Sequence, residues 1–216
     1  MKIYLISNCE SENNENEYDH KVDLSSEGSK HAKFVGVFIA NKLKKISWNG
    51  NVHGRIWYSP YLTSKRTKDI IVKTLKEYGL LFNNGCYESA SLANQQRGLF
   101  DGVASKDVKI VLDQEYYEFK YSLDDRGEFW TQYPRGESAF NVTQRVQQMF
   151  KTIHHDKEHH GIDLTLIISH DIVIRSFIMM WLHKTVEWFE NEPIYNPGSI
   201  QMIDCKKNCN CIFEGF

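Results

Sequence analysis

Two short polar turns, each directly after an apolar run of strand length, hold the residues best suited to chemistry in this sequence. Ser7-Asn8-Cys9 follows the run Ile3–Ile6, and His170-Asp171 follows the run Leu164–Ser169. A thiol and an imidazole are side chains that enzymes use as nucleophiles or as acid–base groups. Because ligands of open α/β sheets bind beyond the carboxyl ends of the strands, we expect the two turns to share one pocket.

The segments that must position these turns alternate between strands and helices. Such alternation is typical of a mainly parallel sheet with helices on both faces, so we predict a three-layer α/β/α sandwich in a single domain, residues 1–216. An inserted cap or lid is expected around 101–132, where 104–121 has helical spacing, and the acidic loop 10–23 could also cover the pocket. We expect strands at 3–6, 55–58, 87–92, 164–169, 199–204 and 211–216, and helices at 25–45, 63–78, 138–153, 172–183 and 186–190.

Composition narrows the class of protein. The chain has 216 residues, of which 41% are hydrophobic and 25% charged, so it is long enough to bury a core and ordinary for a globular protein. A net charge of −2 gives no reason to expect nucleic acid or a membrane as partner. The longest apolar stretch, Ile172–Leu182, contains Arg175 and is too short to span a bilayer. The start of the chain shows no signal-peptide pattern, and five cysteines, an odd number, suggest free thiols in a reducing compartment. We therefore expect an intracellular, cytoplasmic protein. We also expect no cofactor.

Several motifs, in this order along nearly the whole chain, carry a resemblance. They are Leu24-Ser25-Ser26-Glu27-Gly28 and Tyr58-Ser59-Pro60, each before a helix, then the more specific Tyr133-Pro134-Arg135-Gly136-Glu137-Ser138 and Ile168-Ser169-His170. Together they resemble the histidine phosphatase superfamily, and the segment 177–198 is similar to its broad-specificity branch, which hydrolyses phosphomonoesters. The resemblance implies a phosphoglycerate mutase-like fold and a structural role for Glu137.

The resemblance also implies what an active pocket contains. In the family, a histidine in an Arg-His-Gly box attacks phosphorus and becomes a phosphohistidine. That arginine, a second arginine after the Ser-Pro turn and a second histidine hold the phosphoryl oxygens. A carboxylate from a middle loop protonates the leaving oxygen. Fixed cations are needed because charge spreads over the transferring group.

This sequence departs from that pattern at most of these positions. Asn8 occupies the nucleophile position, and an amide is a poor nucleophile because its nitrogen lone pair is delocalised into the carbonyl. By the same correspondence, Ser7 and Thr63 occupy the positions of the two arginines, and Asn94 occupies that of the acid. The second histidine is retained as His170. We therefore predict a vestigial phosphate pocket with a degenerate catalytic box, made of Ser7, Asn8, Cys9, Thr63, Asn94 and His170.

Two substitute nucleophiles are open to the chain. Cys9 would need an arginine six residues later in a phosphate-cradling loop, but Glu15 is found there and would repel phosphate, so a small buried thiol is favoured. His170 could act with Arg66, one helical turn beyond Thr63 and a possible anion contact. Further candidates for this alternative are the weaker contacts Arg97 and Arg135 and the carboxylates Glu10 and Asp171.

Two groups of metal-ligating residues have simpler interpretations. His154-His155 and His159-His160 fall at a predicted helix end in a polar loop, which is typical of a solvated connection. Cys205, Cys209 and Cys211 lack a Cys-x-x-Cys pair and are interpreted as free thiols on a terminal hairpin. We therefore expect no metal.

Three functional hypotheses follow. The first is a catalytically inactive pseudophosphatase that acts as an interaction or scaffold subunit, or as a weak binder of an anionic ligand. Its partners would be another protein, a larger assembly or a phosphorylated small molecule. The alternative is a divergent phosphomonoester phosphatase with a site rebuilt around His170. A third possibility is a purely structural subunit of a larger assembly, which predicts an apolar surface patch of interface size away from the pocket.

Overall fold

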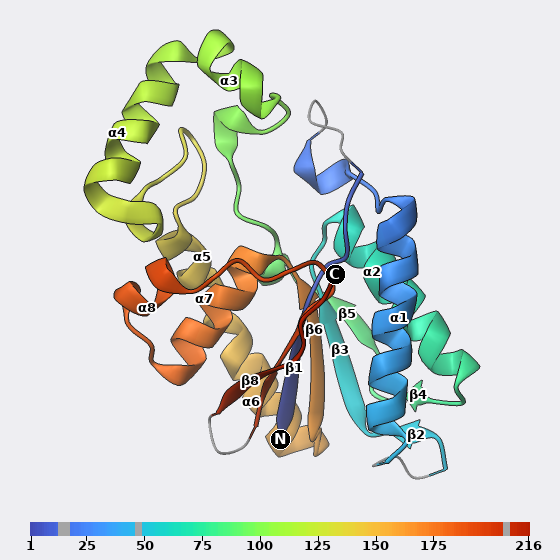
Figure 1. Ribbon diagram of the computed structural model, residues 1–216. Coiled ribbons are helices and arrows are strands. Elements are labelled where there is room, and N and C mark those ends of the chain that lie inside the picture. Colours follow the sequence, from blue (N-terminus) through green and yellow to red (C-terminus); the bar gives the residue numbers. More distant parts are fainter. Residues whose placement is uncertain (13–17, 46–48, 205–207) are drawn as a thin grey trace.

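A six-stranded sheet forms the centre of the protein. The computed structural model describes residues 1–12, 18–45, 49–204 and 208–216 (Figure 1). The strand order is β5-β3-β6-β1-β7-β8; β7 is antiparallel to both its neighbours and the other pairs are parallel, which confirms the predicted mainly parallel α/β fold. The strands are β1 (Lys2–Ser7), β3 (Gly54–Tyr58), β5 (Cys86–Glu88), β6 (Leu164–Ser169), β7 (Ile200–Ile203) and β8 (Cys209–Phe213).

Helices cover both faces of this sheet (Figure 1). Side chains of β1 alternate between the two resulting cores: Ile3 and Leu5 belong to one, Tyr4 and Ile6 to the other. This alternation follows from the two-residue period of a strand, and it explains why a central strand is apolar throughout. The first core packs against α5 (Ala139–Val146), α6 (Gln148–His160), α7 (Asp171–Leu182) and α8 (Val186–Asn191), and the second against α1 (Ser26–Leu43) and α2 (Leu62–Glu77).

The register of the sheet brings three strand ends to one edge. Ser7 of β1 pairs with Ser169 of β6, and Tyr58 of β3 pairs with Ile168 of β6. The turns that follow β1, β3 and β6 therefore meet at the carboxyl edge of the sheet. Helices begin soon after: α7 starts directly after His170, and α2 starts at Leu62.

The segment between η3 (Gly98–Phe100) and α5 forms two helices that stand away from the sheet (Figure 1). They are α3 (Ser105–Val111) and α4 (Asp113–Trp130), so the single helix predicted over 104–121 is wrong in detail. Gly127 interrupts α4 with a φ of 79°, a conformation that glycine adopts without strain. The backbone N–H groups of Glu128 and Phe129 then donate to the Glu190 carboxylate of α8 at 3.2 and 2.7 Å.

Other boundaries also differ from the sequence predictions. The strand predicted over 87–92 is β5 followed by a turn of 3₁₀ helix, η2 (Ala90–Leu92). The helix predicted over 138–153 is two helices that meet at Gln147, and the second runs on to His160. A small parallel pair, β2 (Asn51–Val52) with β4 (Leu81–Phe82), was not predicted. Of the predicted hairpin turn 206–208, residues 206 and 207 lie outside the described part of the chain. None of the described helices is long and apolar enough to cross a membrane.

Candidate functional site

A cavity of about 460 Å³ opens at the carboxyl edge of the sheet, where β1 and β6 end. Thr63, predicted for the pocket, does not line it; this side chain is buried in the first turn of α2. The other five predicted pocket residues line the cavity: Ser7, Asn8, Cys9, Asn94 and His170. The two turns identified in the sequence thus contribute to one cavity, as the sheet register requires.

His170 is held by hydroxyl groups at the end of β3 and the start of α2. Its Nε2 lies 3.0 Å from the Ser59 hydroxyl and 3.4 Å from the Ser64 hydroxyl, and its ring meets Tyr61 edge-on at 5.0 Å. Burial, with a smaller contribution from the positive charge of Arg145, lowers the pKa of His170 to about 3. The imidazole is therefore uncharged at neutral pH.

Asn8 is half-buried at the position that the resemblance assigns to the nucleophile. Its backbone N–H donates to the Ser169 carbonyl at 2.7 Å, a bond that continues the β1–β6 pairing past the strand end. Its side-chain amide nitrogen donates to the Cys9 carbonyl at 3.3 Å. These bonds hold Asn8 beside the cavity but give it no nucleophilic character.

Cys9 lines the cavity as a thoroughly buried thiol, with 1% of its surface exposed. Its backbone N–H donates to the Thr67 hydroxyl at 3.1 Å. Burial raises the pKa of the Cys9 thiol to about 12, so the thiolate needed for nucleophilic attack is scarce at neutral pH. Glu15, which bears on the cysteine hypothesis, lies outside the described residues.

Carboxylates outnumber cationic side chains in the described lining of the cavity. The basic member of this lining is Arg97, whose guanidinium lies 3.8 Å from the Asp101 carboxylate. The acidic members are Glu10, Asp19, Glu128 and Asp171. The lining therefore favours cationic or neutral groups over a phosphate dianion.

Arg175 neutralises part of this negative charge from behind the cavity. It is 3% exposed, stacks against Phe189, and bonds Asp171 at 2.8 Å and Glu128 at 3.0 Å. Burial raises the pKa of Asp171, while Arg175 and the backbone N–H of Tyr195 act in the opposite direction. The guanidinium is engaged by these partners and does not itself line the cavity.

A hydrogen-bond bridge ties the loop after β1 to the middle of the chain. The Asn94 side chain donates to the Asp19 carboxylate at 2.6 Å, and the Asp19 backbone N–H donates to the Asp101 carboxylate at 3.1 Å. Asn94 and Asp19 both line the cavity, so η1 (Asp19–Lys21) lies against its rim.

The predicted anion contacts outside the strand ends do not reach the cavity, apart from Arg97. Arg66 is more than half exposed and pairs with Asp23 at 3.2 Å, which corrects its predicted place in the pocket. Arg135 is exposed in the turn before α5, with a φ of 56°, and does not line the cavity either. The hypothesis of a site rebuilt from His170 and Arg66 lacks the geometry it needs.

Arg145, which the sequence reasoning missed, organises the loop beside the cavity. Its guanidinium bonds Glu137 at 2.9 Å and donates to the carbonyls of Ser91 and Asn94 at 2.9 and 3.0 Å. Glu137 in turn accepts from the Gln96 backbone N–H at 3.0 Å. Glu137 thus has the structural role that the resemblance implies, through its bonds with Arg145. The sequence signal for Arg145 was its place on the same short helix as the buried residues Val142 and Val146.

The two described C-terminal cysteines, Cys209 and Cys211, belong to no metal-ligating group among the described residues. Cys209 and Cys211 are free thiols in β8, the first partly buried and the second exposed. Burial raises the pKa of Cys209 to about 11. Cys205 lies outside the described residues. The four histidines 154, 155, 159 and 160, expected in a loop, all lie on α6 instead.

Comparison with known proteins places this geometry in context. A family model described as histidine phosphatase superfamily (branch 1) matches residues 3–212. The phosphoglycerate mutase-like protein AT74 of Arabidopsis thaliana is 25% identical over 93% of this chain and 63% of its own length. The broad-range acid phosphatase DET1 of Saccharomyces cerevisiae is 31% identical over 49% of this chain and 35% of its own length. The chain therefore spans less than two thirds of either curated relative.

Solved structures share the fold. The alpha-ribazole phosphatase from Shigella flexneri superposes with a TM-score of 0.73 at 16% identity, covering 100% of this chain and 96% of that one. A mycobacterial glucosyl-3-phosphoglycerate phosphatase gives a TM-score of 0.70 at 13% identity, with 99% and 98% covered. At this identity the likeness concerns the backbone arrangement and leaves the chemistry of the cavity to its own residues.

Proposed function

This chain belongs to the histidine phosphatase superfamily, and we propose that it is a member that works by binding rather than by phosphoryl transfer. The observation that carries the proposal is that Asn8, at the position that the sequence resemblance assigns to the family's nucleophile, lines the cavity. In a measured protease, removal of the nucleophile alone reduces kcat by about 10⁶-fold. An amide at this position supports a loss of the same order here.

The charges around the cavity support the same proposal. Phosphoryl transfer needs fixed cations around the transferring group, and the described lining offers Arg97 against four carboxylates. Two of these carboxylates, Glu128 and Asp171, are paired with Arg175, which leaves Glu10 and Asp19 facing the cavity without that compensation. A phosphate dianion would meet them without the arginine pair that the resemblance implies. The weak anion-binding form of the proposal is therefore less favoured than an interaction role.

The helices α3 and α4 supply a surface for such a role. Ile110, Val111, Tyr117 and Tyr121 are all more than half exposed on this pair of helices, which stands away from the sheet (Figure 1). Contiguous exposed apolar surface marks interaction sites in proteins that are otherwise well packed. We assign the binding of a protein partner, or of a larger assembly, to this surface.

A divergent phosphatase remains the second candidate, because His170 lines the cavity and a curated relative is named a broad-range acid phosphatase. A neutral imidazole is chemically competent as a nucleophile. Against it, Nε2 of His170 is already engaged by Ser59 and Ser64, and Arg66 is paired with Asp23 on the surface.

A turnover assay separates the two candidates. Purified native chain, His170→Ala and the less disruptive His170→Gln are compared on an aryl phosphate and a panel of phosphometabolites, with Arg66→Ala as a surface control. We expect all four proteins to show the same background rate. Turnover in the native chain and in Arg66→Ala that disappears in both His170 variants would refute the proposal and establish a rebuilt site.

The interaction surface has its own test. We expect native chain in a cell extract to migrate in a complex on size exclusion, and Ile110→Asp/Tyr121→Asp to migrate alone. The matched control is Phe34→Asp, an exposed aromatic on α1 whose replacement should leave the complex intact. A complex that survives the double replacement on α3 and α4 would assign the interaction to another surface.

A further inference from the structure

The C-terminal turns of α6 gather histidines that the sequence analysis placed in a loop. The helix runs to His160 and ends at Gly161, which has a φ of 64°. Because residues three and four apart lie near one another on a helix, His155 lies beside His159, and Asp156 lies beside His160. The ring centres of His159 and His160 lie 4.4 and 5.5 Å from that of His155. The helix thus brings the imidazoles of His155, His159 and His160 into one compact group.

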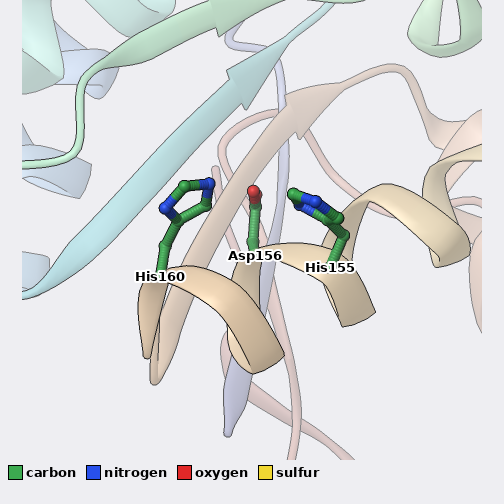
Figure 2. Close-up of side chains that lie close together, drawn as sticks. All are labelled: His155, Asp156 and His160. Carbon is green, nitrogen blue, oxygen red and sulfur yellow. The ribbon is translucent and has the colours of Figure 1, made fainter.

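Asp156 joins two of these histidines in a group with metal-binding geometry. One potential ligand atom each from His155, Asp156 and His160 lies within 4.8 Å of the others, and their side chains project from the same part of α6 (Figure 2). Ligands of a tetrahedral zinc ion lie about 3.3 Å apart, given Zn–N distances of about 2.0–2.1 Å. Both histidines are exposed and can rotate to close this difference.

Asp156 is fixed in place by the sheet. It is 2% exposed, forms an ion pair with Arg55 and accepts a hydrogen bond from Trp57 Nε1 at 3.3 Å. A carboxylate has about four acceptor positions, so these two contacts leave room for a further bond. Such partners orient a ligating carboxylate, while the positive charge of Arg55 reduces its attraction for a dication. The balance predicts a site of moderate rather than very high affinity.

We propose that His155, Asp156 and His160 bind one divalent transition-metal ion, with water completing the coordination. Two imidazoles and one carboxylate suit Zn²⁺, Cu²⁺ or Ni²⁺, whereas Mg²⁺ and Ca²⁺ prefer all-oxygen ligands. The sequence analysis expected no metal at these histidines because it placed them in a solvated loop. They lie on α6 instead, so that reason does not apply.

The site lies away from the cavity. The end of α6 leads into the amino end of β6 at Leu164, whereas the cavity lies beyond the carboxyl end of the same strand at His170. A metal bound here takes no part in chemistry at the cavity. It would hold the last turn of α6 against β3, because Asp156 contacts Arg55 and Trp57 of that strand. The expected consequence is higher stability of the metal-bound protein.

Calorimetric titration of the tag-free chain with ZnCl₂ at pH 7.5 tests the proposal. We expect one Zn²⁺ ion per chain, no heat with MgCl₂, and a rise in melting temperature with Zn²⁺. His155→Ala/His160→Ala should bind at least tenfold more weakly and lose the rise in melting temperature. Both side chains are exposed, so circular dichroism of this variant should remain native-like.

The same helix offers a matched control. His154 points elsewhere: its ring stacks on Trp181 at 5.1 Å, and Nδ1 lies 2.7 Å from the Phe150 carbonyl oxygen. We expect His154→Ala to bind Zn²⁺ like the native chain, and His159→Ala to weaken binding less than His160→Ala. Equal Zn²⁺ affinity in the double variant and the native chain, or no binding by the native chain, would overturn the proposal. Loss of binding in His159→Ala with retention in His160→Ala would also overturn this ligand assignment.

Discussion

Nε2 of His170 lies 3.0 Å from the hydroxyl oxygen of Ser59, so two neighbouring strand ends are joined by a side-chain hydrogen bond at the rim of the cavity. Ser59 follows β3 and His170 follows β6, and the Ser59 backbone N–H also donates to the Ile168 carbonyl at 3.0 Å. The histidine to which the resemblance assigns a phosphate contact here bonds to the end of a neighbouring strand. Its burial as a neutral group has a measurable consequence for stability.

Stability should fall in mild acid because of His170. The folded protein lowers the pKa of this imidazole from 6.5 to about 3, so between these pH values the unfolded chain binds more protons than the folded one. The free energy of unfolding therefore decreases as pH falls below 6.5, by up to about 1.4 kcal/mol per pH unit from this group. Urea unfolding at pH 7.5 and 5.5 measures the decrease. His170→Gln should show a smaller one; the same decrease in both proteins would contradict the prediction.

Loss of Arg145 should destabilise the fold far more than loss of Arg66. Arg145→Met leaves Glu137 and the carbonyls of Ser91 and Asn94 without their donor in a partly buried place, and we expect unfolding to become easier by about 2–4 kcal/mol. Arg66→Met removes an exposed pair with Asp23, which is expected to change stability by about 0.5 kcal/mol or less. Urea unfolding at pH 7.5 gives both values, and similar losses would contradict the assigned role of Arg145.

Cys9 should resist alkylation in the folded protein. Its thiol is buried and its pKa is raised to about 12, whereas Cys211 is exposed on β8. We expect iodoacetamide at pH 7.5 to modify Cys211 at least tenfold faster than Cys9, and denaturant to remove the difference. Mass spectrometry of the peptides locates the label. Rapid labelling of native Cys9 would revive the cysteine-nucleophile hypothesis.

A single restored nucleophile should not restore hydrolysis. Asn8→His supplies an imidazole, but the positions of the two family arginines remain Ser7 and Thr63. Each missing transition-state donor is worth about 10²–10³ in kcat, so we expect the variant to stay at least about 10⁴-fold below an active relative. Aryl phosphate turnover and a search for phosphohistidine check this expectation. Turnover near that of an active relative would show that the acidic lining is no obstacle.

The fold and the strand-end part of the site could be predicted because they depend on local sequence. The apolar runs 3–6 and 164–169 are buried strands, and parallel strands bring their carboxyl ends together whatever the rest of the chain does. Ser7, Asn8 and His170 were therefore found from the turns alone. The resemblance assigned a family position to each of these residues, and it also added Asn94, which the turns do not indicate.

The remainder depends on contacts between distant segments. The acidic lining includes Asp19 and Glu128, which come from η1 and α4 and reach the cavity only through tertiary packing. Arg66 was placed in the pocket by its spacing from Thr63, but Thr63 itself does not line the cavity, and Arg66 pairs with Asp23 on the surface. The end of α6 was misplaced because its last turns are polar and carry little hydrophobic period, although Gly161 is an available C-terminal cap.

The position of β1 in the sheet has a consequence for how the chain folds. Lys2 pairs with Leu164 on one side, and Ile3 pairs with Ile203 on the other, so both neighbours of this strand come from far along the chain. Contacts of such large sequence separation slow folding, because loop closure must precede any gain from pairing. During synthesis, the apolar segment that forms β1 stays unpaired until its partner strands have been made, and it can aggregate during this time. We therefore expect slow refolding and a dependence on chaperones during synthesis.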